Sequence, residues 1–116
     1  NEGYWYTKGM ETLQELMDHI ARVWKCDPAR YPELECMNEA QRKNFLVKHS
    51  VLHIAKSNGK VAALCEDFDH DQTVGEEYSE ELKTLAVKMF INSLKLGEEA
   101  GLSADELLKK APIYIK

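Results

Sequence analysis

Apolar residues recur at helical spacing over three long stretches of the chain, about residues 9–25, 41–71 and 75–100. The first stretch carries Leu13, Leu16, Met17, Ile20, Val23 and Trp24. The third carries Leu82, Leu85, Ala86, Met89, Phe90, Leu94 and Leu96. No stretch alternates between apolar and polar residues with a period of two, so the pattern predicts an all-α protein.

Capping residues indicate where these helices begin and end. Thr7 or Thr12 precedes the first helix, and Asp27-Pro28 ends it. The predicted capping pairs of the later helices are Asn38 with Gln41, Thr73 with Glu76, and Ser103 with Glu106, and Gly101 is placed just past the end of the third long helix. The last pair opens a short helix over residues 104–110 that stops before Pro112.

These elements predict one domain over residues 1–116, a helical bundle of about four helices. An N-terminal arm covers residues 1–8, where Tyr4, Trp5 and Tyr6 are expected to seal a core end or an oligomer contact. Residues 26–38 contain two prolines and no helical repeat of apolar residues, so they are predicted to be a surface loop. Residues 111–116 are predicted to be a C-terminal tail.

The middle stretch carries a line of basic side chains. At ~100° per residue, Arg42, His49, His53, Lys56 and Lys60 fall within roughly 60° of one another around the helix. The positions beside this line are almost all apolar, so we expect the rest of the helix to be covered. A line of this kind either forms the wall of a binding site or is the only solvent-exposed face of a central helix.

The overall charge makes this basic line an exception. The chain has a formal net charge of −5, which disfavours a nucleic-acid partner held by bulk electrostatics. A short turn requires the second and third long helices to pair antiparallel, which brings Lys88 toward the line. His49, His53, Lys56, Lys60 and Lys88 are therefore the predicted site for a phosphate or carboxylate. The alternative is that both helices simply show polar faces to solvent.

Two groups of residues resemble parts of known metal sites. His49 and His53 have the i, i+4 spacing of helical zinc ligands, but the expected third ligand is missing and Lys56 and Lys60 repel a cation. Asp67, Asp69 and Asp71 resemble the start of a calcium loop, yet Gln72 stands where the turn glycine belongs. We expect no metal ligands in either place.

Compartment and redox state follow from composition. No apolar run reaches the ~18 residues of a membrane span, and no signal-peptide pattern opens the chain, so a soluble cytoplasmic protein without a membrane partner is expected. Cys26, Cys36 and Cys65 are odd in number and lack zinc-site spacing, which favours reduced thiols, although a bridge from Cys26 to Cys36 is conceivable.

The segments LHIAKSNGKVAALCEDFDH and MFINSLKLGEEAGLSADELLKK, with the order of elements over about residues 38–110, resemble the MazG-like all-α nucleotide pyrophosphohydrolases. The resemblance implies a helical bundle that assembles as a dimer or higher oligomer. It also implies nucleoside triphosphate hydrolysis with magnesium held by acidic residues of two helices.

This sequence departs from that family's metal-binding pattern. The acidic positions of the second core helix fall on Lys56, Ser57 and Lys60, and the Glu-x-x-Asp pair falls on Leu85 and Lys88. Magnesium chemistry needs carboxylate oxygens, so the family mechanism does not transfer residue by residue. Magnesium is expected only if acids outside the motif substitute, and Glu66, Asp67 and Glu81 are those within reach of a shifted register.

Three functions are consistent with these sequence features. The first is a MazG-like protein, expected to be a homodimer, in which lysines and histidines replace the metal ligands and bind a nucleotide or another phosphate-bearing anion directly. The second is an active pyrophosphohydrolase with rearranged acids. The third is a helical homo-oligomer kept for protein contacts, with no small-molecule site.

Overall fold

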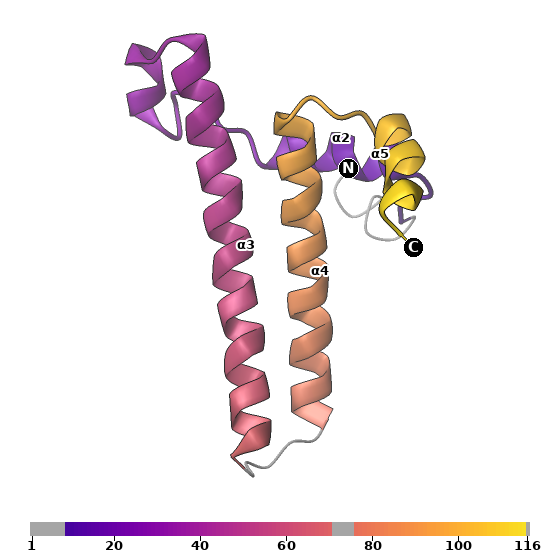
Figure 1. Ribbon diagram of the computed structural model, residues 1–116. Coiled ribbons are helices and arrows are strands. Elements are labelled where there is room, and N and C mark those ends of the chain that lie inside the picture. Colours follow the sequence, from indigo (N-terminus) through magenta and orange to yellow (C-terminus); the bar gives the residue numbers. More distant parts are fainter. Residues whose placement is uncertain (1–8, 71–75, 116) are drawn as a thin grey trace.

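The computed structural model describes residues 9–70 and 76–115, and within these ranges every regular element is helical (Figure 1). The elements in chain order are α2 (Leu13–Val23), η1 (Pro32–Cys36), α3 (Glu39–Asp69), α4 (Glu76–Glu99), α5 (Ala104–Lys110) and η2 (Ala111–Tyr114). The all-α prediction is confirmed. The aromatic arm and the cap at Thr73 lie outside the described residues.

Helix ends follow the predicted side chains closely. Thr12 accepts a hydrogen bond from the Glu15 amide and begins α2. The Asn38 and Gln41 pair and the Ser103 and Glu106 pair both form reciprocal capping boxes, at the starts of α3 and α5. Each box satisfies two amide groups that a helix start leaves without partners.

Two segments predicted without regular structure contain short 3-10 helices. Within the 26–38 loop, Pro32 opens η1, and within the 111–116 tail, Pro112 lies in the first turn of η2. A proline is tolerated at a helix start because the amide hydrogen it lacks has no partner there in any case. These two short helices were not predicted, because neither segment shows the repeat of apolar residues by which longer helices are recognised.

The hydrophobic core is small and lies to one side. Met17 and Ile20 of α2 meet Leu94 of α4 and Ala104 of α5, with Leu107 packed beside them. By contrast, α3 packs mainly along α4 in a long antiparallel hairpin (Figure 1). The buried residues of α3 are Ser50 and Ser57.

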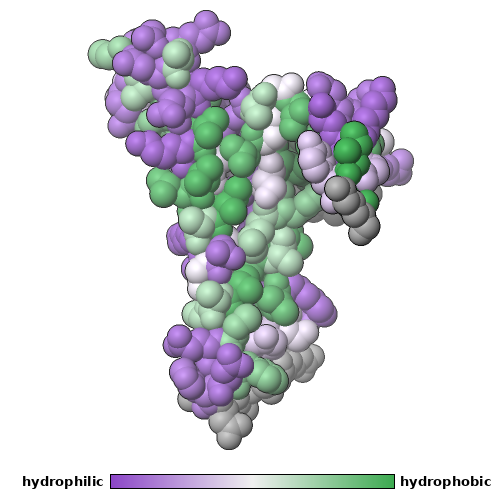
Figure 2. All heavy atoms as spheres, in the orientation of Figure 1, coloured by the Kyte–Doolittle hydropathy of each residue, from purple (hydrophilic) through white to green (hydrophobic). Residues whose placement is uncertain are grey.

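The expectation that α3 is covered beyond its basic line is wrong for the single chain. Val51 and Leu52 are 45% and 61% exposed, and Val87 and Phe90 of α4 are also exposed. In Figure 2, apolar side chains run along the hairpin, while hydrophilic ones gather near its tip and near the start of α3. The cause is that, in the part of the chain that the structure describes, α4 is the helix that packs along α3, and it covers one side of α3.

The described part of the chain contains no helix that is both long enough and apolar enough to cross a membrane.

Candidate functional site: a cationic pocket between α3 and α4

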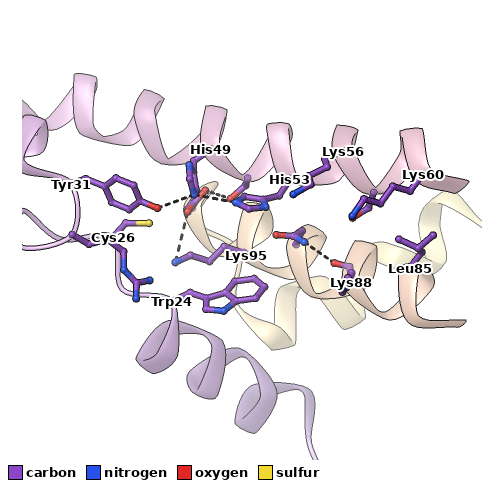
Figure 3. Close-up of a pocket in the computed structure, with 15 residues that line it drawn as sticks. Trp24, Cys26, Tyr31, His49, His53, Lys56, Lys60, Leu85, Lys88 and Lys95 are labelled. Carbon is purple, nitrogen blue, oxygen red and sulfur yellow. Dashed lines mark hydrogen bonds and ion pairs between the residues drawn. The ribbon is translucent and has the colours of Figure 1, made fainter. Parts of the chain in front are cut away.

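A cavity of about 430 Å³ opens between α3, α4 and the loop before η1 (Figure 3). This volume is within the range of small-molecule sites. Its lining includes all five residues predicted for the anion site, which are His49, His53, Lys56, Lys60 and Lys88. The structure therefore brings these side chains to one cavity.

Small residues on α3 leave room for this cavity. Ser50 and Ser57 of α3 and Leu85 and Asn92 of α4 line the cavity, and all four are buried. The Asn92 amide donates to the Lys88 carbonyl at 2.8 Å, which holds its side chain against its own helix. With short side chains on α3, the long side chains of the lysines border an open space rather than a packed one.

Positive charge dominates the lining. Arg30 and Lys95 join Lys56, Lys60 and Lys88, so the described residues of the lining include five permanent cations and one acid, Glu99. Among the described residues, Lys56, Lys60 and Lys88 form no ion pair. Their ammonium groups are therefore available to a ligand.

The single acid is engaged by its neighbours. Ser50 Oγ donates to Glu99 Oε2 at 2.8 Å, and Lys95 Nζ lies 3.7 Å from Glu99 Oε1. Burial raises the pKa of the Glu99 carboxyl, and the Ser50 hydrogen bond and the Lys95 charge oppose that rise. Glu99 thus ties α3 to α4 and offsets the charge of Lys95.

The loop before η1 supplies residues that the sequence analysis did not assign to the site. The carbonyl of Asp27 accepts from the amides of Arg30 and Tyr31, and its carboxylate accepts from the Arg30 amide as well. This turn carries Arg30 and Tyr31 to the cavity. The sequence feature that indicates this turn is Asp27-Pro28, a pair that favours turn formation.

A side-chain hydrogen bond holds η1, which follows this loop, against α3. Arg42 Nε donates to the Leu34 carbonyl at 2.9 Å, and Leu34 is buried. Arg42 belongs to the predicted basic line, but its guanidinium is used here and does not line the cavity. The line on α3 therefore divides into one structural residue and four residues at the site.

His49 and His53 form a connected pair at one end of the cavity. Tyr31 Oη and His53 Nε2 each lie 3.2 Å from His49 Nε2. Partial removal from water lowers the pKa of His53, with further lowering from His49 and the Lys56 charge. The neutral form of His53 is therefore favoured.

Cys26 and Trp24 complete the same end of the cavity. Burial is the main cause that raises the pKa of the Cys26 thiol, and Lys95 opposes it. All three cysteines are free, as expected. Trp24 and Tyr31 add flat aromatic surface beside the cations (Figure 3).

The acids considered for a shifted metal motif lie elsewhere. Glu66 and Asp67 are exposed near the end of α3, Glu81 is exposed in the second turn of α4, and none of them lines the cavity. Within residues 9–70 and 76–115, no group of three or more histidines, cysteines or acids is placed to hold a metal ion. The cavity offers donors to anions.

Comparisons with family models, with curated proteins and with solved structures give no match to this chain.

Proposed function

We propose that this protein binds a phosphate-bearing anion, such as a nucleotide, in the cationic pocket between α3 and α4. The observation that carries the proposal is the convergence of five cations from three segments on one cavity, in a chain of net charge −5. Ammonium and guanidinium groups bind phosphate oxygens through charge-assisted hydrogen bonds. In a concave site these interactions are stronger than on open surface.

A nucleotide suits the mixed character of the lining. The lysines of α3 and α4 offer donors to a polyphosphate, while Trp24 and Tyr31 offer aromatic surface to a base. We propose a MazG-like scaffold for the bundle, on the segment resemblance alone. The proposal covers binding and not turnover, because the motif positions carry Lys56, Lys60 and Lys88 where carboxylates would hold magnesium.

A paired experiment separates binding from turnover. Calorimetric titrations with ATP and with inorganic triphosphate measure binding, and a parallel assay measures pyrophosphate release with and without magnesium. The proposal predicts saturable binding of both anions, weakened by salt. Absence of binding to either anion contradicts it. Magnesium-dependent release would instead favour the pyrophosphohydrolase with rearranged acids.

Homo-oligomerisation is a second candidate, favoured by the exposed apolar surface of the hairpin. The radius of gyration is 17.1 Å, whereas a compact domain of this length has about 13 Å. Val51, Leu52, Val87 and Phe90 are exposed along α3 and α4. A two-helix layer of this kind is completed by a second layer. Sedimentation measures this directly, and a monomer at micromolar concentration contradicts it.

A further inference from the structure

The outer face of α3, on the side away from α4, is not covered by any residue that the structure describes. Leu52 is 61% exposed there, and Ala55, Gly59 and Ala62 are exposed as well. A methyl group built at Gly59 meets no atom within 4 Å. At ~100° per residue these four positions share one side of the helix, opposite the buried Ser57. No contact within residues 9–70 and 76–115 accounts for a small apolar surface at this place.

One charge of each sign closes this apolar face at its two ends. Lys48 lies before Leu52 and Glu66 lies after Ala62, and both are exposed. They are eighteen residues apart, which is five full turns, so they point in the same direction. Neither forms an ion pair among the described residues. At a rise of ~1.5 Å per residue they are about 27 Å apart, too far to pair within one chain.

The arrangement is symmetric about residue 57. Lys48 and Glu66, Leu52 and Ala62, and Ala55 and Gly59 are each equidistant from that position. If a second copy of α3 runs antiparallel with its two-fold axis there, every residue of a pair meets the other member on the partner. A two-fold interface has this property, since residue i contacts j and j contacts i.

We propose that this face of α3, from Lys48 to Glu66, is an antiparallel contact with a second copy of the chain. Ala55 and Gly59 lie at the centre, where small side chains allow two helices to approach closely. Lys48 of each copy meets Glu66 of the other, so the interface contains two ion pairs. The pocket stripe of α3 points elsewhere and stays open, and the two proposals are independent.

Charge complementarity identifies the partner as the chain itself. An apolar face alone would accept many partners, but this one carries a lysine and a glutamate at matched distances from its centre. The contact deepens the homo-oligomer candidate by giving it a face, an orientation and a register.

Charge reversal tests the register. Lys48→Glu alone and Glu66→Lys alone each place like charges together twice in the dimer, so each raises the dimer dissociation constant about tenfold or more at low salt. The double variant Lys48→Glu/Glu66→Lys restores the pairs and returns the constant to within about threefold of wild type. Sedimentation equilibrium gives the constants, and Lys43→Glu, exposed on another side of α3, is the matched control with no effect.

The outcomes separate this contact from oligomerisation in general. A wild-type chain that sediments as a monomer overturns both. A dimer that ignores the single reversals, or one that the double variant does not restore, overturns this contact and leaves the homo-oligomer candidate in place. All these substitutions are at exposed positions, and circular dichroism verifies that each variant is folded.

Discussion

At the scale of single residues, the pocket combines permanent cations with side chains whose charge depends on pH, and His53 is one of these. His53 contacts His49 and lies near Lys56, and its pKa is lowered by partial removal from water and by these two neighbours. A lowered pKa means that the unfolded chain takes up the proton first as the pH falls. The stability that His53 contributes is therefore present above its ordinary value of 6.5 and is lost as the pH falls through its lowered value.

His53→Gln tests this linkage. The wild type should lose more unfolding free energy than the variant when the pH falls from 7.5 to 5, because the variant has no imidazole to protonate there. Urea unfolding at both pH values measures the difference. His70→Gln, at the exposed end of α3, is the control. Equal losses in wild type and His53→Gln would show that the histidine pair does not oppose protonation.

The acid of the pocket gives a second residue-scale prediction. In its ionised form Glu99 repels an anion and occupies Lys95, which lies 3.7 Å away. Glu99→Gln removes that charge and leaves Lys95 with only its longer contact to Glu98, at 3.9 Å, so inorganic triphosphate should bind about three- to tenfold more tightly at pH 8, an effect of order 1 kcal/mol. Calorimetry measures the change, with the exposed Glu80→Gln as control. Weaker binding would mean that Glu99 holds Lys95 in its binding position.

At the scale of elements, the helix ends are well determined by local sequence. Gly101 was predicted as the residue just past the third long helix, and it has φ +91° there. The Leu102 amide donates to the Gly97 carbonyl and the Gly101 amide to the Glu98 carbonyl, which is the Schellman arrangement. Caps are predictable because a side chain and a backbone group within a few residues satisfy each other without tertiary partners.

Two glycines near this end should respond to alanine in opposite directions. A methyl group at Gly97 would meet Leu107 at 3.7 Å, an ordinary contact, so Gly97→Ala should raise the unfolding free energy by about 0.5–1 kcal/mol through helix propensity. Gly101→Ala should lower it by about 1 kcal/mol because the left-handed backbone crowds a Cβ. Urea denaturation compares the two. Destabilisation by both variants would contradict the packing described around Gly97.

The surroundings of α3 were less predictable than its ends. Helical periodicity gave its length to within about two residues, but could not tell an apolar position covered by its own chain from one left exposed. Val51 and Leu52 look like core residues in sequence, whereas Ser50 and Ser57 are buried. Which side is buried depends on where α4 crosses, and that is a tertiary property.

At the scale of the whole molecule, the pocket joins residues that are distant in sequence. The five predicted residues line one cavity because α3 and α4 are antiparallel. This orientation was predicted from the short connection between the two helices. Lys95 was not assigned to the site from the sequence. Arg30 and Tyr31 were not assigned at all, since their position depends on the Asp27 turn and on the contact of Arg42 with Leu34.

The central claim is that the cavity binds phosphate through its free ammonium groups, and Lys60→Ala tests it most directly. Lys60 lines the cavity without an ion pair among the described residues, whereas Lys83 is exposed on α4 and pairs with Glu80 at 3.2 Å. Titration with inorganic triphosphate should show that Lys60→Ala weakens binding by about 1–3 kcal/mol, while Lys83→Ala leaves it unchanged. Equal affinity for wild type and Lys60→Ala, or equal losses in the two variants, would contradict a phosphate site in this pocket.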